Sequence, residues 1–137
     1  MQETRPSYTA EKVAMRRAAH QVFDDAPHLV ADPLAVPIIG PEAEARMRAM
    51  RQQGPFAKVG RAFVLARLRF AEDMLARAVQ QGVTQYVVLG AGLDTFAYHN
   101  PFPALRVFEV DHPATQIWKK ERLAAAGIAI PENVTQV

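Results

Sequence analysis

The sequence contains no cysteine, which excludes a disulfide framework, a cysteine nucleophile and a thiolate metal site. It also has no uncharged apolar run near the roughly 18 residues that a membrane span requires. The first twelve residues, MQETRPSYTAEK, lack the apolar core of a secretory signal. Half of the chain is hydrophobic and 22% is charged, an ordinary globular balance. We therefore expect a soluble cytoplasmic protein with no membrane partner.

Patterns for hydrolytic or metal chemistry are missing as well. The chain has four histidines, His20, His28, His99 and His112, and none forms a pair at helical spacing. There is no Ser/His/Asp arrangement and no set of ligands at metal-binding spacing. We expect no metal ion, and no catalytic residue can be named from such patterns.

The N-terminal part of the chain predicts helices separated by proline-rich sequence. Thr9 can cap a helix from about residue 10 to residue 23. Four prolines between Pro27 and Pro41 predict an extended segment with a turn or two rather than a long helix. A short helix around Glu42–Gln52 follows, and Pro55 opens a long helix that ends before Gly82. The arginines of residues 44–61 lie at helical spacings without interleaved aromatic residues, which favours a solvated helix face over a nucleic-acid surface.

The long helix has an arginine within its apolar face. With Phe63 as the origin and about 100° per residue, Phe70 falls near −20° and Met74 near 20°, and the apolar arc continues to Leu68 near 140°. Arg67 lies at about 40°, inside that arc, whereas Arg69 lies at about 240° on the opposite face. A cation inside a core-facing stripe is costly unless an anion meets it. That anion is either a side chain or a ligand, and the sequence leaves both open.

From residue 84 the pattern changes to that of an α/β sheet. The runs TQYVVLG (84–90), LRVFEVD (105–111) and NVTQV (133–137) are typical of buried parallel strands, and residues 112–127 predict a helix between the last two. This order predicts right-handed crossovers in an open, Rossmann-like sheet. We expect residues 1–82 to form a helical lead-in and residues 83–137 to form the first part of a cofactor-binding domain.

The turn after the first strand, LGAGLDT, predicts the class of cofactor. Gly90 and Gly92 fit the first two glycines of a dinucleotide fingerprint, and Asp111 is placed to hold a ribose. However, the third glycine is replaced by Thr95, and Asp94 puts negative charge where a diphosphate would lie. S-adenosylmethionine carries a cation and no phosphate, and it fits these residues better. The alternative is that Asp94 and Thr95 cap the next helix.

Longer strings resemble a known family. QYVVLGAGLDTFAYHNP, followed by RVFEVDHPATQIWKKERL, resembles the leucine carboxyl methyltransferase-like family of class I S-adenosylmethionine-dependent methyltransferases. The segments SYTAEKVAMRRAAH, Asp32–Pro33 and ARLRFAEDML are also similar to that family's N-terminal part. The resemblance covers essentially the whole chain.

The resemblance implies specific roles. Gly90, Ala91 and Gly92 would form the nucleoside turn, and Asp111 would bind the ribose, with Asp94 near the cationic part of the cofactor. Arg67 matches an arginine that binds the methionyl carboxylate, and Lys12 matches a lysine that approaches the cofactor. The family further implies methyl transfer to an oxygen nucleophile, a carboxylate, without a metal ion.

Two departures leave alternatives open. His99 stands where relatives often have arginine, and only three of the usual seven strands can be counted. We therefore expect a Rossmann-like fold truncated after about three parallel strands, with self-association through its sheet edge. The chain could be a fragment, a truncated product or one piece of an assembly. A nicotinamide-dependent oxidoreductase half-domain and a non-catalytic remnant are the competing interpretations.

Overall fold

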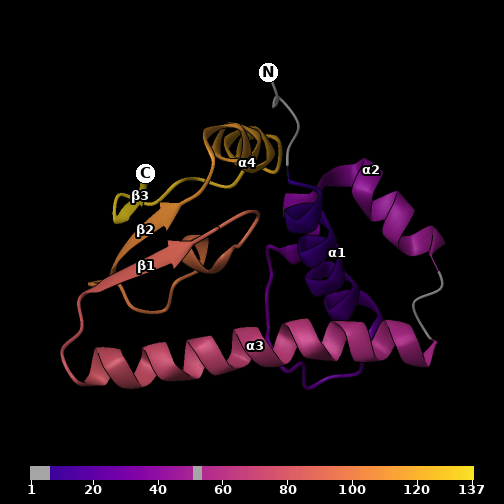
Figure 1. Ribbon diagram of the computed structural model, residues 1–137, viewed down its shortest axis with the longest axis horizontal. Coiled ribbons are helices and arrows are strands. Elements are labelled where there is room, and N and C mark those ends of the chain that lie inside the picture. Colours follow the sequence, from indigo (N-terminus) through magenta and orange to yellow (C-terminus); the bar gives the residue numbers. More distant parts are fainter. Residues whose placement is uncertain (1–6, 51–53) are drawn as a thin grey trace.

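The computed structural model describes residues 7–50 and 54–137 and shows four helices, one short 3-10 helix and a parallel sheet (Figure 1). The predicted α/β class is confirmed. In chain order the elements are α1 (Tyr8–Phe23), α2 (Ala35–Ala49), α3 (Pro55–Gln80), β1 (Gln85–Leu89), η1 (Phe96–Tyr98), β2 (Arg106–Val110), α4 (Pro113–Ala125) and β3 (Val134–Gln136).

Helix α1 begins earlier than the sequence predicted. Its N-cap is Ser7, whose hydroxyl accepts a hydrogen bond from the Ala10 amide at 3.2 Å, so the assignment of Thr9 as the cap was wrong. The helix buries Ala14, Ala18 and Ala19. These small side chains allow α2 to pack closely against it, and the two helices share one hydrophobic core cluster.

The proline-rich segment is more helical than expected. Helix α2 starts at Ala35, contains Pro37 in its first turn, and continues across a kink at Gly40 with φ 77°. Proline is tolerated in a first turn because those amides have no helical acceptor, and the kink at Gly40 accommodates Pro41. A Cβ at Gly40 would lie 2.6 Å from the Arg122 guanidinium, so the absence of a side chain here leaves room for the end of the Arg122 side chain. Residues 51 and 52 of the short helix predicted here lie outside the described residues.

Helix α3 matches the predicted long helix, but only part of its apolar arc is covered. Val64 and Leu75 are buried, whereas Phe63 and Phe70 are 64% and 68% exposed. Arg67 belongs to the exposed part. The prediction that the whole arc faces the core was wrong, because the helix packs along one side of the arc only.

The strands form a parallel sheet in the order β1-β2-β3. Tyr86 pairs with Val107 and Val88 with Glu109, so these four side chains share one face. That face contacts η1, α4 and the C-terminal half of α3 (Figure 1). The core cluster of α1 and α2 includes Leu93 and Leu123, so packing crosses the predicted boundary at residue 82. The division into two domains stays a prediction.

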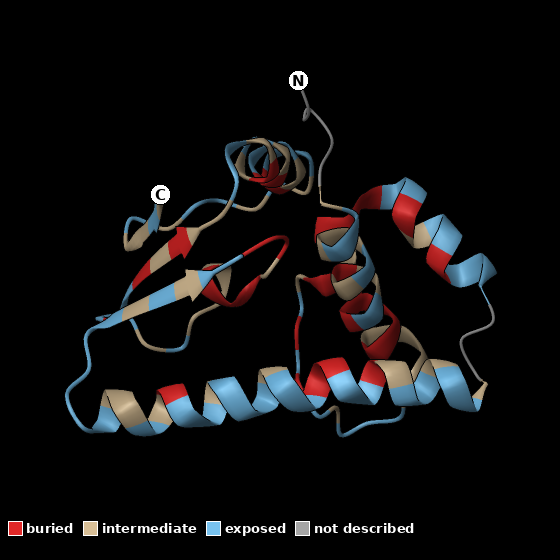
Figure 2. Cartoon of the chain, viewed as in Figure 1, coloured by how far each residue is buried: buried red, intermediate tan, exposed pale blue. Residues whose placement is uncertain are grey.

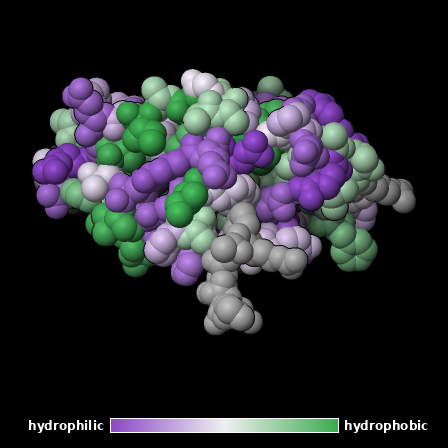
Figure 3. All heavy atoms as spheres, turned by 90° about the horizontal axis from the view of Figure 1, so that it is seen from above, coloured by the Kyte–Doolittle hydropathy of each residue, from purple (hydrophilic) through white to green (hydrophobic). Residues whose placement is uncertain are grey.

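The other face of β1 is open. Val87 and Leu89 are 53% and 78% exposed, although parallel sheets are usually covered on both faces. In Figure 2 the strand β1 is mostly pale blue and tan, in contrast to the red segments of α1 and α2. Figure 3 shows hydrophobic side chains gathered mainly toward the end of the molecule that carries the sheet. At the final strand Val137 is exposed, but the larger exposed apolar surface lies on β1 and α3. Self-association through the sheet edge stays a prediction.

Candidate functional site

The glycine turn after β1 is built against the end of β2. The amides of Gly90 and Ala91 donate to the Val110 carbonyl at 2.8 and 3.2 Å. Gly90 and Gly92 have φ of 65° and 49°, a region that disfavours side chains. The space in front of Gly90 is open, since a Cβ there would meet no atom within 4 Å. At Gly92 a Cβ would lie 2.9 Å from the Cβ of Ala10, so this glycine lets the first turn of α1 approach.

Asp111 lies beside this turn, as the sequence predicted. It follows β2 directly, and its carboxylate accepts the Gly92 amide and the His112 amide, each at 2.6 Å. Each carboxylate oxygen keeps a further lone pair for a ligand. The acid 19 positions after Gly92 is therefore held at the turn by backbone amides and can accept ribose hydroxyls.

Asp94 has a local structural role that the sequence left open. Its carboxylate accepts the Phe96 amide at 2.9 Å, at the start of η1. The hydroxyl of Thr95 makes no capping bond. The capping alternative is therefore confirmed for Asp94 and wrong for Thr95. Because Asp94 is only partly buried, its negative charge still acts on the surroundings of the turn.

Glu72 adds to this negative environment and was missed in the sequence. Burial raises the pKa of Glu72, and the charges of Asp94 and Asp32 raise it further. Burial likewise raises the pKa of Tyr86, with Asp94 and Glu72 as additional causes. The region beside the turn thus favours a cation over a phosphate.

A buried ion pair fixes the loop that follows the turn. Arg17 of α1 is 4% exposed and donates to the Asp32 carboxylate at 3.1 and 3.3 Å. It also donates to the Leu93 carbonyl at 3.0 Å and to the Thr95 hydroxyl at 2.8 Å. That hydroxyl donates in turn to Asp32 at 2.6 Å. His99 lies 3.5 Å from the same carboxylate.

The Arg17 network was not foreseen as a functional element. The sequence contained two signals for this network, Asp32–Pro33 and Thr95. Both were noted only as positions of motifs and not as partners of Arg17. Its members come from α1, from the segment before α2 and from the loop after Gly92. The network therefore connects the helical part of the chain to the glycine turn.

A second buried polar cluster lies under the sheet. The Glu109 carboxylate accepts from the Lys119 ammonium at 2.6 Å and from the Tyr98 hydroxyl at 2.7 Å. Burial raises the pKa of Tyr98, and Glu109 raises it further. Burial lowers the pKa of Lys119, although Glu109 opposes that shift. The lysine that follows the second strand motif thus acts as a structural partner of Glu109, and it ties α4 to β2.

The two cationic residues that the resemblance assigns to the cofactor do not hydrogen-bond to the glycine turn. The guanidinium of Arg67, an exposed residue, lies 5.7 Å from the centre of the Phe63 ring on its own helix. The ammonium of Lys12 lies 4.3 Å from the centre of the Tyr8 ring and lines a separate cavity. Arg69 is exposed and pairs with Asp73, as expected of the opposite face. Contact of Arg67 or Lys12 with a cofactor stays a prediction.

Within residues 7–50 and 54–137, no group of three or more acidic or histidine side chains is placed to hold a metal ion. None of the helices described there is long and apolar enough to cross a membrane.

The fold and turn define a class: an α/β protein with a glycine turn and an acid, Asp111, at the carboxyl ends of β1 and β2. Residues 10–137 match the family model described as leucine carboxyl methyltransferase. The chain belongs to that family, as the resemblance predicted.

Relatives agree with this membership. The chain is 51% identical over 72 residues to YktD of Bacillus subtilis, covering 51% of the chain and 24% of the relative. It is 41% identical over 109 residues to a Parafrankia protein (77% and 33%) and 36% identical over 127 residues to a Saccharopolyspora erythraea protein (88% and 42%). The names of all three place them among the S-adenosyl-L-methionine-dependent methyltransferases. The chain spans less than half the length of these relatives.

Proposed function

We propose that this chain binds S-adenosyl-L-methionine at the turn after β1 and contributes that site to a methyl transfer onto a carboxylate oxygen. The observation that carries the proposal is the contact between Asp111 and the Gly92 amide, beside two glycines with positive φ. This arrangement offers a ribose acceptor next to backbone that a nucleoside can approach. Family membership is the evidence against the nicotinamide alternative.

The residues of the turn fit the proposed cofactor on physical grounds. The open space at Gly90 leaves room for a nucleoside, and Asp94 and Glu72 favour a cation nearby. Gly90, Ala91, Gly92 and Asp111 would hold the nucleoside. Arg67 would meet the carboxylate of the amino acid tail, and Lys12 would approach the cofactor; both roles come from the family resemblance. The cofactor supplies an electrophilic methyl group on sulfur.

The protein's contribution to such a reaction is alignment. A carboxylate acceptor is already ionised at neutral pH, so no general base is required of the chain. Holding two reactants in line and excluding water supplies most of the rate enhancement in such a case. The Arg17 network serves this purpose by fixing the loop that carries Asp94.

Calorimetry with the 137-residue chain tests cofactor binding. We expect S-adenosylhomocysteine to bind and NAD not to bind. Asp111→Ala should weaken binding by about 1.5–3 kcal/mol, the usual range for hydrogen bonds to a charged group. Asp25→Ala, at an exposed aspartate, is the matched control and should leave the affinity unchanged. Binding of NAD with none of S-adenosylhomocysteine would contradict the proposal.

A further inference from the structure

Helix α3 carries a row of exposed large apolar side chains, referred to below as the α3 row. It consists of Phe56, Val59, Phe63, Phe70 and Met74. On the helical wheel all five lie within about 40° of Phe63. The exposed arginines Arg67 and Arg77 border the row. An exposed apolar patch with a polar border typically marks an interaction surface.

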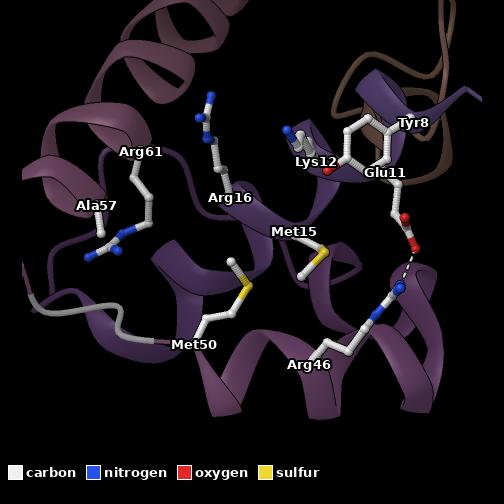
Figure 4. Close-up of a pocket in the computed structure, with 9 residues that line it drawn as sticks. All are labelled: Tyr8, Glu11, Lys12, Met15, Arg16, Arg46, Met50, Ala57 and Arg61. Carbon is white, nitrogen blue, oxygen red and sulfur yellow. Dashed lines mark hydrogen bonds and ion pairs between the residues drawn. The ribbon is translucent and has the colours of Figure 1, made fainter.

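The chain's own elements cover the other side of α3. Val64 and Leu75 are buried, and they lie about 100° and 120° away from Phe63 on the wheel. Ala57 and Arg61 line a cavity together with residues of α1 and α2 (Figure 4). In Figure 1, α3 runs along one border of the molecule, with α1 and the sheet on the same side of it. The α3 row therefore faces away from the described core.

The α3 row has the same spacing in both directions along the helix. Phe63 and Phe70 lie equally far from the midpoint between residues 66 and 67, and so do Val59 and Met74. A twofold axis through this midpoint, perpendicular to the helix, generates an antiparallel copy of α3. Phe63 then lies level with Phe70 of the second copy, and Val59 lies level with Met74. The row is thus complementary to itself, as the interface of a twofold symmetric dimer must be.

Residues at the same level in such a pair pack side by side. Val59 lies near −40° and Met74 near 20° about the helix axis, so the two side chains lie on opposite sides of the seam. Ala66, which is exposed beside the row, leaves room near the axis for larger side chains of the copy. This alternation of large and small side chains is what close packing of two helices requires.

The charges at the border of the row are compatible with an antiparallel pair. Arg67 lies next to the twofold axis, so its charge and that of its copy come near each other. However, its guanidinium lies 5.7 Å from the centre of the Phe63 ring, which is four residues toward the N-terminus of its own helix. In antiparallel helices these directions are opposite, so the two guanidinium groups point away from each other. Arg77 lies level with Phe56 of the second copy, a combination that suits a cation–π contact.

The exposed area is sufficient for a weak dimer. A fully buried aromatic side chain loses about 150–250 Å² of accessible surface, so the three phenylalanines at their exposed fractions would bury about 450 Å² per copy. Val59 and Met74 bring the total for a pair to roughly 1,200 Å², the lower end of specific interfaces. We propose that the α3 row binds the α3 row of a second copy of this chain in antiparallel orientation. This proposal does not depend on cofactor binding.

Sedimentation equilibrium of the 137-residue chain tests the dimer. We expect a monomer–dimer equilibrium in the micromolar range. Phe63→Glu combined with Phe70→Glu places like charges opposite each other in the seam and should weaken dimerisation at least about a hundredfold. Both positions are exposed, so the variant should fold, and circular dichroism checks this. A chain that stays monomeric at high micromolar concentration would show that the row serves another partner and would overturn the proposal.

Val87→Glu is the matched control. Val87 is an exposed apolar residue of β1 outside the α3 row, and its substitution should leave dimerisation unchanged. If Val87→Glu abolished the dimer while the double substitution on α3 did not, the chains would associate through the sheet. The assignment of the interface to α3 would then be wrong.

A charge-exchange experiment separates specific pairing from general apolar association. A second variant combines Phe63→Lys with Phe70→Lys. Since residue 63 of one copy lies level with residue 70 of the other, the Glu and Lys variants place opposite charges together when they are mixed. The mixture should associate more strongly than either variant alone. A mixture that associates no more strongly would contradict the proposed register.

Cross-linking tests the antiparallel orientation. The chain has no cysteine, so single cysteines can be introduced. A Val59→Cys chain and a Met74→Cys chain should be joined by a thiol reagent that spans about 10 Å, the distance between packed helices. Two Val59→Cys chains should not be joined, because an antiparallel pair separates these positions by about 22 Å along the helix. Cross-linking of the Val59→Cys chain to itself would indicate parallel helices and overturn the proposal.

Discussion

Arg17 on α1 and Arg67 on α3 both stand among apolar residues in the sequence, and the fold treats them in opposite ways. Arg17 is 4% exposed and donates to Asp32, Thr95 and the Leu93 carbonyl. Arg67 is exposed and lies near the Phe63 ring. The difference is that a carboxylate 15 residues away in the chain reaches Arg17, whereas Arg67 lies on the exposed side of α3 together with Phe63 and Phe70.

Arg61 on α3 is intermediate between these two. Its side chain is 2% exposed, but that of its partner Asp24 is 25% exposed. The three arginines therefore form a series in which the carboxylate partner is buried for Arg17, partly exposed for Arg61, and absent among the described residues for Arg67. The energetic consequences should follow the same order.

The largest effect is expected from Asp32→Ala. This change leaves the buried guanidinium of Arg17 without its charge partner, which typically costs about 3–5 kcal/mol. The Thr95 hydroxyl would lose its acceptor as well. Urea unfolding followed by the fluorescence of Trp118, the one tryptophan of the chain, measures the loss.

Asp73→Ala is the matched control for this experiment. Its partner Arg69 is 52% exposed, and exposed pairs of this kind contribute about 0–1 kcal/mol. If the two substitutions had equal effects, burial would not explain the difference between the two ion pairs.

An intermediate loss of unfolding free energy is expected when acid protonates Asp24 and breaks its ion pair with Arg61. The hydrogen bond from Arg61 is the main cause that lowers the pKa of Asp24 from 3.8 to about 2, with His20 contributing. A carboxylate with a lowered pKa in the folded state stabilises the fold above its unfolded pKa. That stabilisation is lost as the pH falls from 3.8 toward about 2.

The pH dependence of the unfolding free energy checks this. Asp24→Asn should lose stability at neutral pH, by less than Asp32→Ala because Asp24 is partly exposed, and its stability should fall less between about pH 4 and pH 2. An acid profile identical to that of the unmodified chain would show that Asp24 does not contribute. Asp25→Asn, at the exposed neighbouring aspartate, should leave the profile unchanged.

The smallest effect is expected from Arg67→Ala. An exposed arginine with a ring contact on its own helix should change stability by no more than about 0.5 kcal/mol. Arg69→Ala should behave similarly. The same unfolding experiment measures both, and a loss above about 2 kcal/mol for Arg67 alone would show that it has a buried partner in solution, contrary to the series.

Local patterns were sufficient for most elements of the fold and for the centre of the site. The long helix from Pro55, the three strands and the position of Asp111 beside the glycine turn follow from periodicity, glycine positions and the geometry of parallel strands. These are short-range rules, or rules about which strand ends meet. The kinked helix α2 was missed because the density of prolines argues against one long helix. The kink at Gly40 instead allows two short helical segments to follow each other.

The sequence by itself determined the family, the order of elements and the position of the glycine turn between β1 and η1. Only the tertiary structure decided which cations are buried, which half of the α3 arc is covered, and that Lys12 lies with Arg16 in a separate cavity. The reason is physical. Periodicity fixes the direction of a side chain about its own helix, but burial and pairing depend on which distant segment packs there, as Asp32 does against Arg17.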